Sequence, residues 1–486
     1  MLMSSHTTSE PLTYDAIRRS LGRKFNTFDV YKTVKEWDSG HAHFTHFTLT
    51  RSRPKAKDSP SHDFVGKQYQ TTQTSDDPLY AICHSPDLLF AREKRNLELI
   101  IDTVGTRFSR KHARTLVPEV YGASAQDHLL NMGYLAGDNQ KKVLLTLDKA
   151  VAETIDPNTQ GRYHQFSQEF LRGVISMARF VGSCNAAGDL LKQRWDFERD
   201  QQTTARVQNE LFLKTLLRLA YASNEGFRTY AQQQGALDNP IEAARDYATT
   251  LLSNPLLGKL QTIRDARRSF RLEDKFQHGD CSGLNQIGST MLDLEDFGLD
   301  DPCSDPGSYH TLLGLVGSSI LHSADFPYTI QAYLAVEHAF ETQDEEGMKE
   351  LPTATNGKFG KYIQKWIEQA DYERFILGVF GQMIDKLVYL GGGISRHDRP
   401  ELVYGANVGI DNIRASIEDV FRTVSQLDSF AILDKNESSA RHAFAEYAKV
   451  LNTLGITEIE TPVLMALEGS STAIRLRQAD PYSSQR

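Results

Sequence analysis

The chain has 486 residues, of which 40% are hydrophobic and 24% are charged, and its formal net charge is −9. This length and composition allow two or three domains with buried cores and exclude an intrinsically disordered chain. No run of Lys and Arg forms the basic stripe that phosphate backbones require, which argues against nucleic acid as a partner.

The cysteines and the apolar runs indicate the cellular compartment of the protein. The four cysteines show no Cys-x-x-Cys spacing and are too few for a disulfide framework, which suits a reducing compartment and argues against zinc. Residues 1–15 lack the order of a signal peptide, and the longest nearly apolar run, 311–321, is shorter than the roughly 20 residues that span a bilayer. We therefore expect a cytoplasmic protein with no membrane partner; the sequence does not indicate an oligomeric state.

The N-terminal part alternates in the manner of strands. Residues 43–50 and 63–70 are short alternating runs that are typical of strands, and residues 87–104 have a helical period. The sequence predicts a small α+β domain over residues 1–135. His43 and His46 would lie on opposite faces of one strand, so we do not interpret the local histidines as a metal site.

Helical patterns dominate after about residue 140. Residues 360–390 predict a long helix that breaks at the glycines 391–393, and residues 437–454 predict another helix with one apolar face. We interpret this apolar face as core rather than as a cofactor groove. The sequence therefore predicts a helical domain over 136–393 and a helical extension over 394–486.

Two polar motifs interrupt the helical part and carry a family resemblance. HGDCSGLN, residues 278–285, resembles the HGDxxxxN catalytic loop of the aminoglycoside phosphotransferase and choline kinase families, relatives of protein kinases. LDLEDFGLDDPCSD, residues 292–305, resembles their metal loop, IDxExxxxGDPxxD, except that Asp300 replaces the glycine. LVPEVYG at 116–122 resembles the turn that precedes the hinge between lobes.

The resemblance covers roughly residues 30–310. It implies an α+β, bilobal protein-kinase-like fold, with a small β-rich N-terminal lobe, a larger and mostly helical C-terminal lobe and, here, a helical C-terminal extension. ATP would bind in the cleft between the two lobes.

The resemblance also implies roles for the motif residues. Asp280 would accept or orient the proton of the attacking hydroxyl, while Asn285 and Asp293 would hold Mg²⁺ against the phosphates of ATP. His278 and Asp305 would brace the catalytic loop through hydrogen bonds. Glu295 would contact either the metal or a neighbouring basic group; the sequence leaves both open.

Lys67 is the candidate for the lysine that binds ATP. By strand alternation it shares a face with Val65 and Tyr69, and in FVGKQY it resembles the family lysine. Its replacement is expected to leave the fold intact, because a strand lysine beside a cleft contributes little to a core. Its partner would be Glu93, with Glu98 as the alternative.

The other residues that would contact the nucleotide have weaker signals in the sequence. Backbone groups near residues 131–134 would hold the adenine, with Met132 and Tyr134 among the lining residues. The phosphate-binding turn offers only Gly40, where protein kinases have several glycines.

The sequence thus predicts an ATP- and Mg²⁺-dependent phosphotransferase that acts on a hydroxyl of a small molecule, such as an amino sugar or an amino alcohol. The alternative is a catalytically silent kinase-fold protein that binds a nucleotide or a partner and uses its C-terminal helices for interaction.

Overall fold

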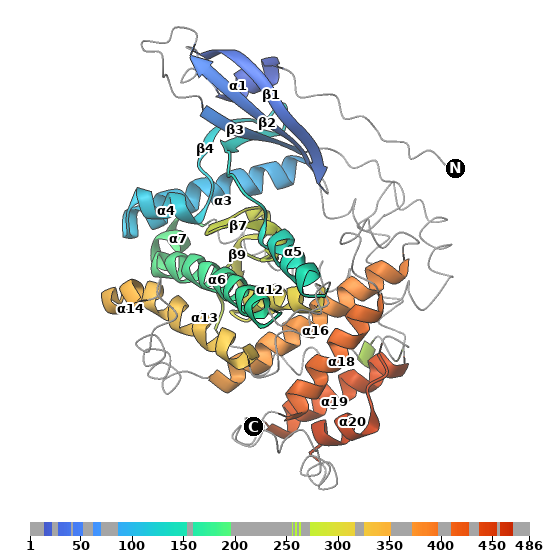
Figure 1. Ribbon diagram of the computed structural model, residues 1–486. Helices are drawn as coiled ribbons and strands as arrows, with labels where there is room; N and C mark the ends of the chain where they lie inside the picture. Colours follow the sequence, from blue (N-terminus) through green and yellow to red (C-terminus); the bar gives the residue numbers. More distant parts are fainter. Residues whose placement is uncertain are drawn as a thin grey trace, which may run out of the picture. The chain divides into compact units, whose positions relative to one another are not determined.

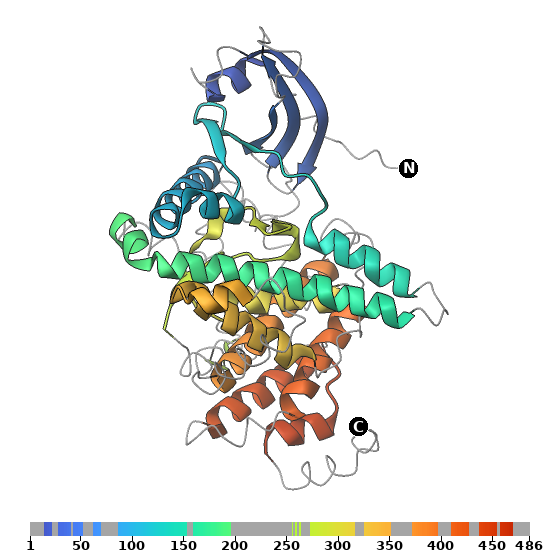
Figure 2. The ribbon, with the colours of Figure 1, turned by 60° about the vertical axis from the view of Figure 1, so that its left-hand side comes forward.

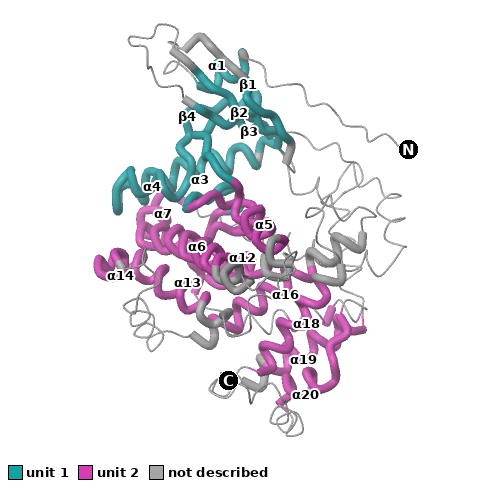
Figure 3. Tube along the Cα trace, in the orientation of Figure 1, with its two compact units in different colours: residues 1–137, 289–296 teal, residues 138–288, 297–486 magenta. Residues whose placement is uncertain are grey.

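The computed structural model describes residues 14–21, 28–39, 42–51, 62–69, 86–152, 159–195, 273–315, 325–350, 372–396, 410–426, 437–453 and 457–469, with a few residues between 255 and 263. It is an α+β structure that divides into two compact units (Figure 3). The first comprises residues 1–137 and 289–296; the second comprises 138–288 and 297–486. The segment 394–486, which the sequence sets apart, therefore belongs to the second unit.

A five-stranded antiparallel sheet forms the first unit, in the order β1-β2-β3-β5-β4 (Figure 1). Its strands are β1 (Phe28–Ser39), β2 (Ala42–Arg51), β3 (His62–Tyr69), β4 (Val120–Ser124) and β5 (Leu129–Gly133). The two strands predicted from residues 43–50 and 63–70 are confirmed as β2 and β3. The short strand β8 (Thr290–Met291) and the 3-10 turn η3 (Leu294–Asp296) also belong to this unit.

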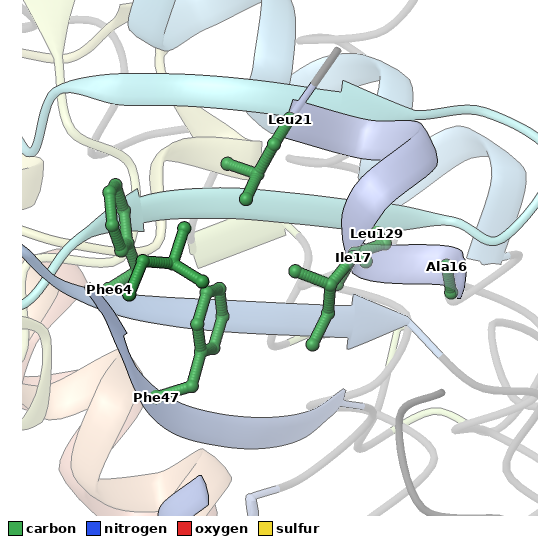
Figure 4. Packing of buried hydrophobic residues seen from close by; sticks show 7 residues of the cluster. Ala16, Ile17, Leu21, Phe47, Phe64 and Leu129 are labelled. Carbon is green, nitrogen blue, oxygen red and sulfur yellow. The ribbon is translucent and has the colours of Figure 1, made fainter. Parts of the chain in front are cut away.

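The helix α1 (Tyr14–Leu21) covers one face of this sheet (Figure 4). The buried cluster between them consists of Ala16, Ile17, Leu21, Phe47, Leu49, Phe64 and Leu129. Gly122 permits the close approach, because a Cβ atom there would lie 2.1 Å from the carbonyl oxygen of Ser20. Asn131 Nδ2 donates a hydrogen bond to Ser20 Oγ and so ties β5 to the helix.

The opposite face of the sheet carries Lys67. Side chains directly opposite one another in an antiparallel pair share a face, and Lys67 is opposite both Phe44 and Leu130. The remaining helices of this unit are α3 (Pro86–Arg107), which confirms the helix predicted over 87–104, and α4 (Arg110–Leu116).

The second unit is mostly helical. Its helices are α5 (Gln140–Ala152), α6 (Thr159–Ala186), α7 (Gly188–Arg194), α12 (Ser304–Leu315), α13 (Asp325–Glu341), α14 (Glu345–Glu350), α16 (Tyr372–Arg396), α18 (Ile410–Gln426), α19 (Glu437–Thr453) and α20 (Thr461–Leu467). The strands β6 (Lys275–Gln277) and β9 (Gly298–Asp300) pair antiparallel, and the 3-10 turn η2 (Gly283–Asn285) precedes β7 (Gln286–Ile287). Helices α6 and α13 lie side by side, as Figure 2 shows.

The long helix α16 does not end where the sequence predicts. It continues through Gly391–Gly393 to Arg396, so the predicted break there is wrong. Each helical glycine costs only about 1 kcal/mol relative to alanine, whereas the buried side chains of α16 pack against α12 and α18. Residues 360–371 of the predicted helix lie outside the described residues. The helix predicted over 437–454 is confirmed as α19, with Phe444, Tyr447 and Leu451 buried.

No helix in the described part of the chain is long and apolar enough to cross a membrane.

The buried His310 of α12 makes the second unit sensitive to acid. Its Nδ1 lies 2.6 Å from the carbonyl oxygen of Pro306, and its Nε2 lies 2.8 Å from Thr329 Oγ1. Burial lowers the pKa of His310 from 6.5 to about 4, because a charged ring would be poorly solvated there. The unfolded chain therefore binds a proton that the folded protein does not, and stability is lost as the pH falls from 6.5 to about 4.

We expect this group to contribute a loss of about 3 kcal/mol across that window. Substitution His310→Gln should remove this part of the pH dependence. Urea denaturation of the wild type and the variant at several pH values between neutrality and pH 4 measures it. Equally steep acid destabilisation in the two proteins would contradict the assignment to His310.

Candidate active site

Lys67 lies in the first unit, buried among carboxylates. Its exposed fraction is 3%, and its Nζ is 2.7 Å from Glu93 Oε2 of α3. It also donates to the carboxylate of Asp293. Of the two partners that the sequence left open, the structure has Glu93, because Glu98 instead pairs with Lys94 on the more exposed side of α3. The Lys67 ammonium lies 4.7 Å from the ring centroid of Tyr69, as expected for two side chains on one strand face.

Three carboxylates gather around this ammonium. Oxygen atoms of Glu93, Asp293 and Glu295 all lie within 4.8 Å of one another. The turn that presents two of them is held to α3 by Asn96, whose Nδ2 donates to the Leu294 carbonyl oxygen over 2.7 Å. Asp293 has a left-handed backbone, with φ of 61°, a conformation that costs energy in a non-glycine residue and is frequent at functional sites.

Burial and the neighbouring charges shift the pKa values of Lys67 and Glu93. Burial alone would lower the pKa of Lys67, but Asp293, Glu93 and Glu295 outweigh it and raise the pKa above its ordinary value. Burial raises the pKa of Glu93 to about 7; Lys67 opposes this shift, and Asp293 and Glu295 reinforce it. Three carboxylates whose oxygen atoms lie this close together could also hold a metal ion. Carboxylate oxygens are the ligands that Mg²⁺ prefers in proteins, and the residues present therefore fit that ion.

Met132 lies on β5, which pairs with the strand that carries Lys67, and Tyr134 follows the end of β5. Met132 is buried opposite Val65, on the same face as Lys67. Tyr134 is 38% exposed and stacks on His46 with ring centroids 3.8 Å apart and an interplanar angle of 7°. The sequence did not predict this contact, because the two residues are 88 positions apart and leave no local pattern.

The backbone amides at the end of β5 are engaged in hydrogen bonds. The Gly133 N–H donates to the Glu119 carbonyl oxygen over 3.0 Å, and the Tyr134 N–H donates to the Asp63 carbonyl oxygen over 3.1 Å. Both amides are thus already engaged within the first unit. These two amides are therefore not free for the adenine contacts that the resemblance implies near residues 131–134.

Asp280 lies in the second unit, in the loop between β6 and η2. Its Oδ1 accepts a hydrogen bond from Lys386 Nζ over 2.9 Å, and its Oδ2 accepts one from Asn285 Nδ2 over 3.2 Å. Asn285 Nδ2 also donates to the Asp280 carbonyl oxygen over 2.9 Å, which closes the loop on itself. Lys386 lies 106 residues away on α16, and no pattern in the sequence connects it with Asp280.

The Asp305 side chain holds this loop through two hydrogen bonds to its backbone. Its buried carboxylate accepts from the His278 N–H over 2.6 Å and from the Gly279 N–H over 3.0 Å. Burial raises the pKa of Asp305, although these two amides favour its charged form. Gly279 has φ of 90°, a conformation that glycine adopts without strain. The His278 side chain is itself buried beside Phe180. Asp305 thus makes hydrogen bonds of the kind that the resemblance implies, and His278 takes part in them through its backbone amide.

The structure therefore brings the expected residues together in two sets. The first unit joins Lys67, Glu93, Asp293 and Glu295, and the second joins His278, Asp280, Asn285 and Asp305. Glu295 lies beside both a basic group and the other carboxylates, so its two expected roles both stay open. Asn285 and Asp293 belong to different units, and a metal ion shared between them stays a prediction. Gly40 lies outside the described residues.

No protein-family model matches the chain. No curated protein matches it either.

Proposed function

We propose that the chain is an ATP- and Mg²⁺-dependent phosphotransferase of protein-kinase-like, bilobal fold that acts on a hydroxyl of a small molecule. The observation that carries the proposal is the buried Lys67, paired with Glu93 of a helix and in contact with Asp293 of the LDLE turn. A buried lysine surrounded by carboxylates suits a site that binds polyanionic phosphates together with a metal ion.

Each set of residues has its part in the proposed reaction. Lys67 would contact phosphate oxygens, and Asp293 and Asn285 would hold Mg²⁺, which would neutralise charge on the phosphates. Asp280 takes the proton of the acceptor hydroxyl. The acceptor oxygen then forms a bond to the γ-phosphorus, and ADP leaves with the electron pair of the broken P–O bond. Glu93 keeps Lys67 in place, and Asp305 holds the Asp280 loop.

The direct test uses ATP labelled in the γ-phosphoryl group and a panel of small polyols, amino sugars and amino alcohols. We expect the label to appear in a phosphorylated acceptor in the presence of Mg²⁺. One observation favours the silent alternative: Lys386 and Asn285 already engage both carboxylate oxygens of Asp280. Thermal stabilisation by Mg-ATP without transfer to any acceptor would support that alternative.

Removal of the metal gives a further prediction. In EDTA, the phosphates of ATP would face these three carboxylates without the charge of the metal ion. We expect ATP to bind at least tenfold more weakly there than in Mg²⁺, because uncompensated like charges repel at short range. Calorimetric titration of the wild type under the two conditions measures this. Equal affinities would remove the metal from the proposal.

A further inference from the structure

The helix α16 places an ammonium group at the candidate catalytic carboxylate. The Lys386 side chain is only 17% exposed, and its Nζ is 2.9 Å from Asp280 Oδ1. Its neighbours Ile384 and Leu387 are buried, so the helix is fixed at this point. Asp385, the preceding residue, accepts a hydrogen bond from the Tyr447 hydroxyl of α19 over 2.9 Å. The position of the ammonium is therefore set by the packed helices of the second unit.

This contact changes the charge that an acceptor meets. Asp280 is the acidic residue of the loop 278–285, and Lys386 balances its charge. The other carboxylate bonded to this loop, Asp305, is fully buried and directed at backbone amides, so it does not offer a charge to an acceptor. An isolated catalytic aspartate would attract a cationic amine next to the reacting hydroxyl. An aspartate whose oxygen accepts a hydrogen bond from an ammonium does not attract such an amine.

We propose that Lys386 determines acceptor specificity: the acceptor is a neutral or anionic alcohol, such as a polyol or a hydroxy acid, and it carries no ammonium group beside the reacting hydroxyl. This inference rests on the proposed phosphotransferase function and narrows its acceptor class. Like charges a few ångströms apart in a partly desolvated site repel enough to change binding on the order of tenfold to a hundredfold. An anionic substituent would instead be attracted to Lys386.

Two matched sets of acceptors test it. Ethylene glycol, ethanolamine and glycolate differ in charge at nearly constant size, as do glucose, glucosamine and gluconate. We measure kcat/KM for Mg-ATP-dependent transfer to each member with the wild type, Lys386→Met and Lys386→Arg. Lys349→Met serves as the control, because Lys349 pairs with Glu345 over 3.0 Å on the exposed helix α14 of the same unit.

The wild type should prefer the neutral and anionic members over the aminated member of each set by at least tenfold. Lys386→Met should move the ratio of aminated to anionic acceptor at least tenfold towards the amine, chiefly through KM. Lys386→Arg, which keeps the positive charge, and Lys349→Met should both retain the wild-type ratios. Circular dichroism shows whether each variant folds. If Lys386→Met does not fold, the acceptor ratios of the wild type and of Lys386→Arg test the inference.

Failure of this inference can be distinguished from failure of the proposed function. Transfer that favours the aminated acceptors in the wild type, or unchanged ratios in a folded Lys386→Met protein, overturns the inference and leaves the phosphotransferase intact. Transfer to no member of either set overturns the inference together with the small-alcohol substrate class of the proposed function.

Discussion

Lys67→Met is expected to lower the rate of phosphoryl transfer on the order of a thousandfold or more. Lys67 places an ammonium among Glu93, Asp293 and Glu295, and without it the phosphates lose a fixed positive charge in the transition state. Single-turnover transfer with the acceptor found by the panel measures the effect. The matched control is Lys94→Met, because Lys94 pairs with Glu98 on a more exposed part of α3.

The same substitution is also expected to destabilise the protein by about 3–5 kcal/mol, because it leaves buried carboxylates without their partner. The sequence had suggested no effect on the fold, on the assumption of a lysine at the edge of a cleft. The structure instead gives Lys67 an exposed fraction of 3% and two carboxylate partners. Urea denaturation without metal should therefore separate Lys67→Met from Lys94→Met. Near-normal transfer by a folded Lys67→Met protein would assign the role to another lysine.

Elements with a strong local period could be predicted from the sequence. The strands β2 and β3 alternate, and α3 and α19 repeat their apolar positions along one face, so each was predicted without knowledge of its neighbours. The end of α16 could not be predicted in this way. Local propensity treats three consecutive glycines as a helix terminator, but α16 continues through them to Arg396, and its preceding turns pack against α12 and α18.

The candidate site, too, could be predicted only where its residues are close in sequence. The spacing of the HGD and LDLE motifs drew attention to Asp280 and Asp293 because those residues are close in sequence. Asn96, whose amide bonds the Leu294 carbonyl oxygen, and Lys386, which bonds Asp280, come from distant helices. Neither has a local signature: a polar residue on a helix usually faces solvent, and only the packing of that helix decides otherwise. The sequence therefore predicted the motif residues and missed the side chains that hold them.

Asp280→Asn and Asp293→Asn are expected to fail in different ways. Asp280→Asn keeps the shape of the side chain and its hydrogen bond with Asn285 but loses the charge that takes the acceptor proton. Transfer should slow on the order of a thousandfold, while the affinity for Mg-ATP stays within about threefold of the wild type. The stability should fall by no more than about 1 kcal/mol, since Asp280 is 39% exposed and its pairing with Lys386 is partly screened.

Asp293→Asn should weaken Mg-ATP binding at least tenfold as well as slow transfer, because it removes a charged ligand of the metal ion. Without metal, however, it should leave the stability unchanged or raise it. Glu93 still pairs with Lys67, and the repulsion of Asp293 by Glu93 and Glu295 is relieved. Calorimetry of Mg-ATP binding, single-turnover transfer and metal-free thermal denaturation of both variants measure the three effects. If Asp280→Asn loses the nucleotide while Asp293→Asn keeps it, the two roles are reversed. If neither variant slows transfer, HGDCSGLN is only a turn held by Asp305, and the reaction takes place elsewhere on the chain.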